Sequence, residues 1–372
     1  MMRYRRWSAR SMIVAPFLAV SVACGAQPVS GPATSAPPIA VASSAVPRAA
    51  LGTVIDDYIA HGSLNLQNIR AVLVSQRGEL LAERYYYSDA AAYAEIHSAT
   101  KSVISTLVGI ALTKGDVKSL DQTLGELLPQ HRSVMSKSSA GTTVRQLLTM
   151  TGGWTAFYDA DTATPELVRR VLIAGPEVEP GRFVYSNVGP HLLSAVLAQA
   201  AGMSTLGYAR RELFDPLGIN SQPAFEGPIA QRDSPEVVST NSFRWLRDPD
   251  SVHGGSYGLA LTARDMIKIG ELWLNGGVWH GRRILDADYI TQASTNQVPE
   301  LAGKIRGYGY LWWVTPLATH GSYSASGRYG QLITVVPDLQ AVIVISSRTL
   351  DDPPSIEDHL AMMDAAIVPG LS

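Results

Sequence analysis

The sequence predicts an α+β fold, in which an antiparallel sheet built from both ends of the folded chain is flanked by helices and carries a mostly helical insertion. Short strand-like runs lie near both ends, within residues 69–87 and 309–346. Between them, from about residue 116 to residue 295, apolar residues recur mostly with the helical period. The composition, with 46% apolar and 17% charged residues, is typical of a protein with a hydrophobic core.

Local signals place each element along the chain. Helices show apolar residues three and four positions apart, Ser or Thr before the first turn and Gly after the last, whereas strands are rich in β-branched and aromatic residues. Helices are predicted at residues 51–59, 98–114, 144–150, 190–201, 205–213, 263–274 and 356–366. Strands are predicted at residues 69–74, 80–87, 309–315, 331–336 and 340–346. The expected N-caps are Thr142 or Thr143, Ser204 and Thr262.

The first 24 residues are predicted to be an export signal. Four arginines precede an apolar run from Met12 to Ala23, which is too short to span a bilayer comfortably. The sole cysteine, Cys24, follows this run directly, as in a bacterial lipoprotein, where such a cysteine becomes the lipidated first residue. An ordinary signal peptide cut near Ala23 or Ala26 is the alternative. We therefore expect an exported protein that is anchored to the membrane through Cys24, or is otherwise periplasmic or secreted.

The rest of the chain divides into a linker and a folded domain. Residues 25–50 are rich in proline, serine, alanine and glycine, which predicts a flexible tether. Residues 51–372 form the predicted domain, with a sheet part at about 51–115 and 296–372 and the helical insertion at about 116–295. The formal net charge is −2 and no long basic run follows the first ten residues, so we expect no nucleic-acid partner.

Ser98 and Lys101 form the first candidate catalytic pair. Their spacing places both side chains on one face of the predicted helix, one turn apart. A serine hydroxyl becomes a nucleophile when a base lies within hydrogen-bond reach, and a lysine is such a base if burial leaves its amine neutral. The helix N-terminus adds backbone N–H groups that suit an oxyanion. Since a chain of this length contains about one Ser-x-x-Lys by chance, the pair needs partners elsewhere.

Tyr185 and Asn187 form the second candidate pair, just after the turn at Pro180-Gly181. A tyrosine beside a lysine can relay a proton between the serine oxygen and the leaving group. An asparagine amide can bind the lysine or the substrate carbonyl. The structural alternative is that Tyr185 lines the edge of a cleft and that Asn187 caps the helix starting after Pro190.

Six segments follow one another in the order Ser98–Ser102, Lys118–Asp121, Leu147–Gly153, Asp215–Ile219, Gly258–Asp265 and Ile284-Leu285. Together with Tyr185-x-Asn187, they resemble the class C β-lactamase-like serine hydrolases. This superfamily includes penicillin-binding DD-peptidases, β-lactamase-fold esterases and 6-aminohexanoate-dimer hydrolase. The resemblance covers about residues 51–350 and implies a serine β-lactamase/DD-peptidase-like fold. It also implies Ser98 as the acylated nucleophile, Lys101 as its base and Tyr185 as the proton relay or second base.

The chain departs from this family at the third motif. The β-lactamases carry Lys-Thr-Gly on the strand that lines the cleft, and the matching place here is Ala325-Ser326-Gly327. Gly327 still lets a substrate approach the strand backbone closely. The resemblance implies that the N–H groups of Ser98 and Arg328 bind the oxyanion. His253-Gly254-Gly255 is a poorer match for this motif because it leads into a predicted helix.

Because alanine replaces lysine in this motif, the sequence does not show which residue supplies the positive charge of the site. The side chain of Arg328, or His320, is a candidate for the lost positive charge, and the alternative for each is a solvated loop residue. The loss makes an efficient β-lactamase less expected and favours esters or small amides.

Together these observations predict an exported serine hydrolase that cleaves an ester or amide bond of a small substrate through a Ser98 acyl-enzyme. The alternatives are a slow or non-hydrolytic penicillin-binding sensor of the same fold, and a true β-lactamase or DD-peptidase. We expect no cofactor and no metal, since the eight histidines are widely spaced. Substrate choice is expected to depend on the loops at 159–165 and 221–253, whose conformation one sequence does not determine.

Overall fold

A computed structural model of the chain describes residues 50–62, 64–155, 165–228, 242–301, 306–348 and 356–371. The predicted export signal and all of the predicted linker except residue 50 lie outside these residues. Most of the loop at 159–165 and the middle of the loop at 221–253 also lie outside them. The described residues all belong to one compact unit, Ser44–Ser372.

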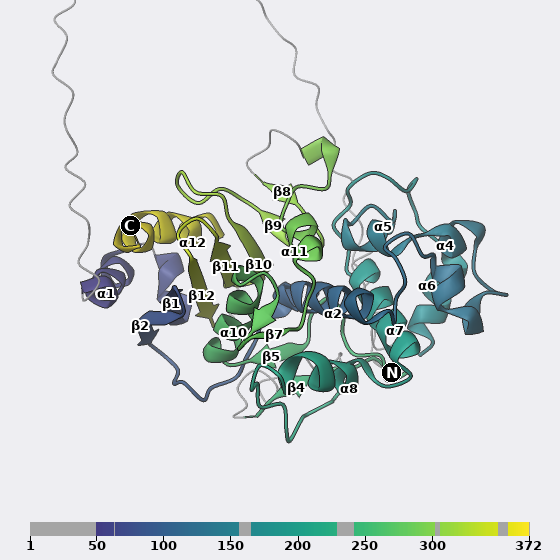
Figure 1. Cartoon of the computed structure of the whole chain (residues 1–372), viewed down its shortest axis with the longest axis horizontal. Coiled ribbons are helices and arrows are strands. Elements are labelled where there is room, and N and C mark those ends of the chain that lie inside the picture. The colour runs from purple at the N-terminus through teal and green to yellow at the C-terminus, as the bar shows by residue number, and fades with distance from the viewer. Residues whose placement is uncertain are drawn as a thin grey trace, which may run out of the picture. The chain divides into compact units, whose positions relative to one another are not determined.

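A seven-stranded antiparallel sheet forms one side of the molecule, with strand order β2-β1-β12-β11-β10-β9-β8 (Figure 1). The first hairpin of the chain meets its last strand because β1 pairs with β12 from Ile69↔Ser347 to Gln76↔Ala341. The predicted sheet made from both chain ends is therefore confirmed. The strands are β1 (Ile69–Gln76), β2 (Glu79–Tyr85), β8 (Gly307–Tyr308), β9 (Trp313–Val314), β10 (Tyr323–Gly327), β11 (Gln331–Val336) and β12 (Ala341–Ser347).

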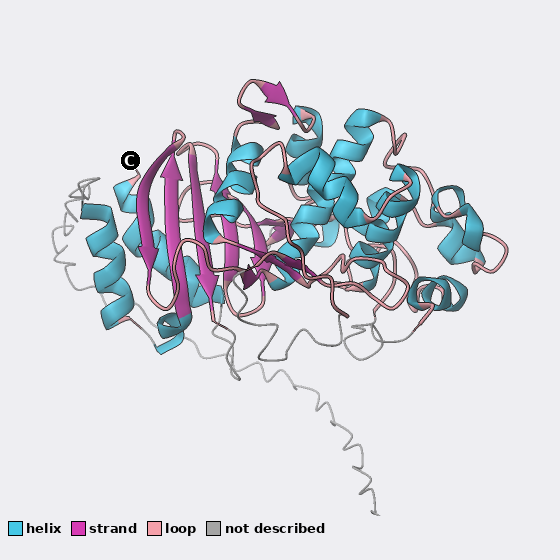
Figure 2. Cartoon of the chain, turned by 90° about the horizontal axis from the view of Figure 1, so that it is seen from below, coloured by secondary structure: helices cyan, strands magenta, loops and turns pink. Residues whose placement is uncertain are grey.

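The two faces of the sheet bury different helices (Figure 2). Side chains alternate along a strand, so that Val72 and Val74 of β1 join one core while Leu73 joins the other. The first core is closed by α1 (Leu51–His61) and α12 (Ile356–Met362), which continues as a π-helical turn to Ile367. The second core is the larger one and extends into the helical part of the molecule.

Helix α10 (Ala263–Leu274) packs on this second face of the sheet, although its residues lie within the predicted helical insertion. Gly270 makes the close approach possible, because a Cβ there would collide with Val342 and crowd Ile333. The main sheet is therefore covered on this face by a helix from the middle of the chain.

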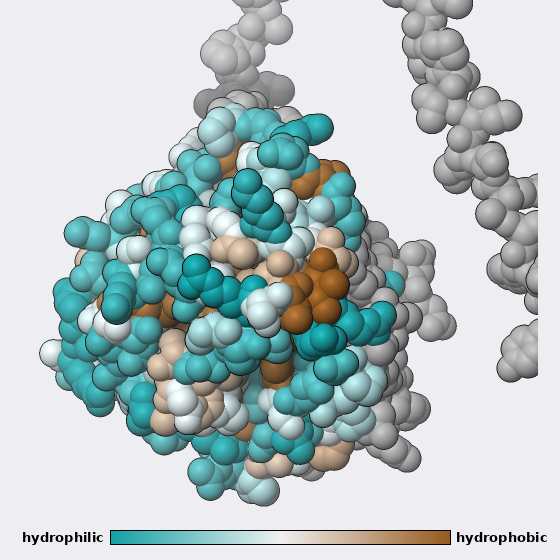
Figure 3. All heavy atoms as spheres, turned by 90° about the vertical axis from the view of Figure 1, so that its right-hand side faces the viewer, coloured by the Kyte–Doolittle hydropathy of each residue, from teal (hydrophilic) through white to brown (hydrophobic). Residues whose placement is uncertain are grey.

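Helix α2 (Thr100–Lys114) runs between the sheet and the remaining helices (Figure 1). It ends at Gly115, whose φ of 81° allows the left-handed cap predicted for this position. The other helices are α3 (Leu124–Leu127), α4 (Lys137–Gly141), α5 (Val144–Leu148), α6 (Leu167–Ala174), α7 (Val188–Ala201), α8 (Thr205–Ala209) and α11 (Ala287–Ala293). Short strands form two small sheets: β3 (Ala94–Glu95), β5 (Leu259–Leu261) and β4 (Arg244–Trp245), and β6 (Val278–Trp279) with β7 (Arg282–Arg283). Figure 3 shows that the surface at the helical end is mostly hydrophilic, with small separate hydrophobic areas.

Three predicted N-caps are confirmed: the side chains of Thr143, Ser204 and Thr262 accept backbone N–H groups of α5, α8 and α10. The strand predicted at 309–315 is largely wrong, because only Trp313–Val314 pairs with β10. Leu311 adopts a left-handed φ of 60° and its N–H donates to the carbonyl of Leu148, within the turn that joins β8 to β9.

Among the described residues, no single helix combines the length and apolar composition of a membrane span. The pair Val188–Ala201 and Thr205–Phe214, bent by 74°, meets that criterion when the two helices are taken together.

Candidate active site

Ser98 lies in a 3-10 turn, His97–Ala99, directly before α2 rather than inside the α-helix. The residue before the turn is held by the small sheet, because the N–H of Ile96 donates to the carbonyl of Leu259 in β5. His97 takes a left-handed φ of 48°. The side chain of Ser98 is partly exposed, whereas Lys101 is only 1% exposed. Lys101 Nζ donates to Ser98 Oγ over 3.1 Å, so the predicted pair is within hydrogen-bond reach.

The amine of Lys101 has two further acceptors. Its Nζ lies 2.8 Å from Asn187 Oδ1 and 3.2 Å from the carbonyl oxygen of Ser256. An ammonium group can donate to all three acceptors, whereas a neutral amine can donate to Asn187 and Ser256 while its lone pair faces Ser98 Oγ. The sequence does not predict Ser256 as part of the site. Its contact is made by a backbone carbonyl, which every residue type carries, so the residue type gives no signal.

Asn187 stands at the N-cap position of α7 but does not cap it. Ser186 Oγ instead accepts the N–H of Val188 over 3.1 Å, which frees the Asn187 amide for Lys101. Of the two readings of Asn187, the structure shows the contact with the lysine rather than the helix cap.

Tyr185 borders the same group. Lys101 Nζ lies 4.9 Å from the centroid of the Tyr185 ring. Burial raises the pKa of Tyr185 to about 12, while a hydrogen bond with Ser98 acts in the opposite direction. The phenol is therefore protonated near neutral pH, and in that state it is a proton donor.

Strand β10 supplies the opposite wall. Ala325 is fully buried in the core, while Ser326 lines the pocket. Gly327 lets the strand approach the nucleophile turn, because a Cβ there would collide with the carbonyl of Ile96 and crowd His97. This close packing is a reason for glycine that the sequence analysis missed.

A pocket of about 270 Å³ opens above these groups. Ser98, Tyr185, Gly327 and Arg328 all line it, and Lys101 and Asn187 lie buried beside Ser98. The structure thus brings all six predicted site residues together, and their roles in catalysis remain predictions.

Two arginines contribute positive charge to this pocket. Arg328 is exposed and its guanidinium lies 4.9 Å from the Tyr329 ring centroid. Arg306, which the sequence analysis missed, lines the pocket from just before β8, far along the chain from every motif. His320, the other candidate for the lost charge, instead pairs with Asp338 at 2.6 Å, at the far end of β10.

The segment His253-Gly254-Gly255 lies beside the site without forming a strand of the main sheet. Gly255 packs on the carbonyl of Pro190 so closely that a Cβ would collide with it. This contact brings the next residue, Ser256, to Lys101.

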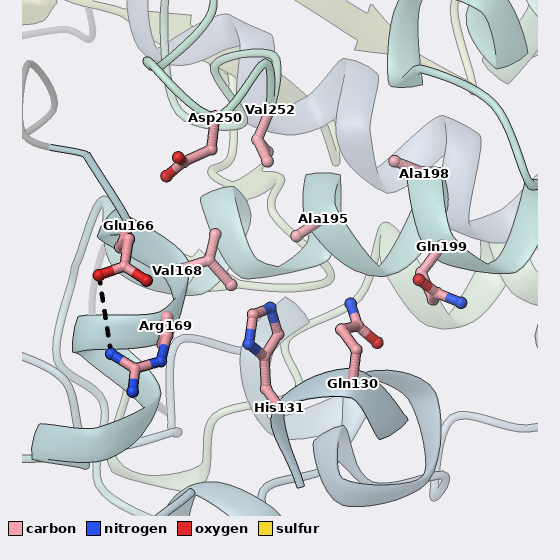
Figure 4. A pocket seen from close by; sticks show the side chains of 10 residues that line it. All are labelled: Gln130, His131, Glu166, Val168, Arg169, Ala195, Ala198, Gln199, Asp250 and Val252. Atoms are coloured by element: carbon pink, nitrogen blue, oxygen red, sulfur yellow. Dashed lines mark ion pairs between the residues drawn. The ribbon is translucent and has the colours of Figure 1, made fainter. Parts of the chain in front are cut away.

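A second pocket, of about 430 Å³, lies over α6 and α7 and contains none of the predicted site residues. In Figure 4, Glu166 and Arg169 face each other from the start of α6, while His131 and Gln130 come from the turn Pro129–His131. The ion pair between Glu166 and Arg169 spans 3.7 Å and both side chains are exposed. Across the described residues, no three His, Cys, Asp or Glu side chains gather in a way that could hold a metal ion.

Comparison with known proteins relates this site to a family. The family model for Beta-lactamase matches residues 69–367. The 6-aminohexanoate-dimer hydrolase of Paenarthrobacter ureafaciens is 25% identical over 308 residues, which are 74% of this chain and 71% of that protein.

Solved structures share the fold at lower identity. A penicillin-binding protein homologue from Caulobacter crescentus superposes with a TM-score of 0.66 at 14% identity, covering 86% of this chain and 97% of that one. A class C beta-lactamase gives a TM-score of 0.63 at 18% identity, covering 85% and 95%.

Proposed function

The chain belongs to the beta-lactamase family, and from that premise we propose that it is an exported serine hydrolase that cleaves an ester or amide bond through a Ser98 acyl-enzyme. One observation carries the proposal: the buried amine of Lys101 lies 3.1 Å from the partly exposed Ser98 Oγ. A nucleophile and a base in contact at the floor of a pocket are what acyl transfer needs.

The proposed acylation starts from the neutral amine of Lys101. Ser98 Oγ bonds to the substrate carbonyl carbon while its proton passes to the lone pair of Lys101 Nζ. The phenol of Tyr185 gives its proton to the departing oxygen or nitrogen as that bond breaks. The raised pKa of the phenol keeps it protonated at neutral pH, so that it has a proton to give. Lys101 then returns a proton to the Tyr185 oxygen, and both groups regain their starting state.

In the proposed deacylation, water adds to the acyl carbon and its proton passes to Lys101 Nζ. The bond to Ser98 Oγ breaks, and Ser98 regains a proton from Lys101. Asn187 Oδ1 and the Ser256 carbonyl keep the amine in place through both steps. The N–H groups of Ser98 and Arg328 are the proposed oxyanion donors.

The proposed substrate is a small ester or amide. A pocket of about 270 Å³ lies below the usual range for drug-sized ligands. Ala325, at the place of the third-motif lysine, is buried. Of the two arginines that line the pocket, Arg306 lies 3.5 Å from Glu357 Oε1, so the positive charge that remains is that of Arg328. This charge favours a substrate that carries an anionic group.

The proposed location is outside the cytoplasm, with Cys24 as the lipid-bearing residue. Support comes from the arginine-rich start and the apolar run before Cys24. Metabolic labelling with a fatty acid that persists in a Cys24→Ser variant would contradict lipidation at this residue.

Hydrolysis of p-nitrophenyl esters and labelling by a fluorophosphonate probe test the enzymatic proposal. Ser98→Ala is expected to lower kcat/KM by about 10⁴-fold or more and to abolish labelling. The matched control is Ser133→Ala, at an exposed position. Turnover that persists in Ser98→Ala would refute the mechanism.

A panel of substrates distinguishes the proposed hydrolase from a penicillin-binding sensor, a β-lactamase and a DD-peptidase. Besides neutral p-nitrophenyl esters, the panel contains a carboxylate-bearing ester, an aminohexanoate oligomer, a chromogenic cephalosporin and a D-Ala-D-Ala peptide. Stoichiometric labelling of Ser98 without turnover of any of them would instead indicate a slow penicillin-binding sensor. Fast turnover of the cephalosporin or the peptide alone would indicate a β-lactamase or a DD-peptidase.

A further inference from the structure

Tyr185 belongs to a cluster of aromatic rings beside the Ser98 pocket. The ring of Trp313 stacks on it, with centroids 5.7 Å apart and planes 24° apart. Tyr308 meets both rings edge-on, at 6.3 Å from Tyr185 and 4.8 Å from Trp313. These are favourable stacked and edge-to-face geometries, so two aromatic side chains of the sheet edge hold the Tyr185 ring.

The segment that carries Tyr185 belongs to no regular element, since residues 182–187 form no helix or strand. It is held by individual hydrogen bonds: the N–H of Phe183 donates to Glu300, and the N–H of Val184 donates to the carbonyl of Met150 over 2.9 Å. Trp313, by contrast, is a residue of β9 and pairs with Ser324 of β10. The indole is therefore carried by the main sheet, which is the same sheet that holds Gly327 against the nucleophile turn.

Two basic side chains lie over the rings of this stack. Lys101 Nζ lies over the Tyr185 ring at 4.9 Å, and the Arg306 guanidinium lies over the Trp313 ring at 5.8 Å. A cation over the face of an aromatic ring is attracted by its quadrupole. Arg306 is itself near Glu357 Oε1, at 3.5 Å. The row Lys101, Tyr185, Trp313 and Arg306 thus links the catalytic amine to the rim of the pocket.

We propose that Trp313 is a positioning residue, which holds the Tyr185 ring at the angle where its phenol oxygen serves Ser98 and the leaving group. This inference rests on the proposed function, because it assigns Tyr185 a step in that reaction. Small displacements of a proton donor slow the chemical step while leaving substrate binding intact.

Two substitutions at Trp313 distinguish the effect of an aromatic ring stacked on Tyr185 from the effect of side-chain size. Trp313→Leu removes the stack and is expected to lower kcat about tenfold for an alkyl ester or an amide, whose leaving group needs a proton, with KM changed by less than about twofold. Trp313→Phe keeps a ring against Tyr185 and should retain at least about half of kcat. Trp279→Leu, the same substitution at a residue of β6 outside the site, should leave kcat unchanged. Thermal unfolding of each variant checks that the fold survives.

A double variant provides a readout that a structural role alone would not move. If Trp313 acts through Tyr185, the variant Tyr185→Phe/Trp313→Leu should be no slower than Tyr185→Phe alone. Losses that multiply would overturn the inference, and so would a raised KM with unchanged kcat, which indicates direct contact with substrate. Absence of any Ser98-dependent turnover in the wild type would overturn the proposed function and this inference with it.

Discussion

The two pockets differ in how their polar groups are arranged. The larger pocket is the weaker candidate for an active site. The pocket over α6 and α7 measures about 430 Å³ and the Ser98 pocket about 270 Å³. In the larger one, Glu166 and Arg169 are 59% and 41% exposed and neutralise each other. In the smaller one, a lysine that is 1% exposed has three acceptors around its amine. Reactivity follows from desolvated groups that converge on one atom, and volume alone does not supply them.

The strongest way to test this contrast is to remove a basic side chain from each pocket. Lys101→Met leaves Ser98 without its base and is expected to lower kcat/KM about 10³-fold. It also leaves Asn187 Oδ1 and the Ser256 carbonyl without the donor they share. Arg169→Met, the same replacement in the other pocket, should leave kcat/KM within about twofold. Ester hydrolysis measured on both variants decides the comparison, and equal losses would break it.

The sequence predicts the side chains of the Ser98 pocket better than the backbone contacts that hold them in place. The spacing of Ser98 and Lys101 and the family resemblance of Tyr185 name side chains, and these side chains meet in the structure. The Ser256 carbonyl and the packing of Gly327 on Ile96 depend on backbone geometry, which no residue type specifies. Support of this kind becomes visible only when segments distant in the chain are brought together.

The fold shows the same limit. Cap chemistry at Thr262 is local and is predicted correctly. The left-handed φ of Leu311, which ends the predicted strand, is uncommon for a residue other than glycine, and tertiary contacts impose it. The packing of α10 on the sheet likewise depends on a distant partner, since its apolar face fits a helical neighbour equally well.

The second prediction uses pH, to which the two pockets respond with opposite sign. Burial raises the pKa of Tyr185 to about 12, so that between pH 10 and 12 the unfolded chain loses this proton first. The stability that Tyr185 contributes is therefore complete below pH 10 and is lost as pH rises toward 12. In the other pocket, burial and then Arg169 lower the pKa of His131. The contribution of His131 is therefore complete above the ordinary histidine pKa and is lost as pH falls below it.

Urea unfolding of matched variants measures both effects. From pH 9.5 to pH 11.5 the wild type should lose up to about 2 kcal/mol more unfolding free energy than Tyr185→Phe, at roughly 1.4 kcal/mol per pKa unit. From pH 7 to pH 5 the wild type should lose more than His131→Gln. Other buried tyrosines are present in both members of the first pair and cancel in the difference. Equal alkaline losses in the wild type and Tyr185→Phe would contradict the raised pKa.

The smallest expected effect lies in the ion pair of the larger pocket. Glu166→Gln keeps the size and shape of the side chain and removes its charge, which leaves Arg169 in contact with solvent. Exposed pairs of this kind contribute about 0.2–1 kcal/mol, and a separation of 3.7 Å places this one at the low end. Unfolding free energy should therefore change by less than about 0.5 kcal/mol, and kcat/KM should not change, because none of the groups around Lys101 lies in this pocket.

The control is Arg169→Gln, which removes the other charge of the pair and should give the same result as Glu166→Gln in both measurements. A several-fold loss of kcat/KM in either variant, with the fold intact, would mean that the two pockets are coupled through α7, which carries Asn187 at its start and Gln199 near its end.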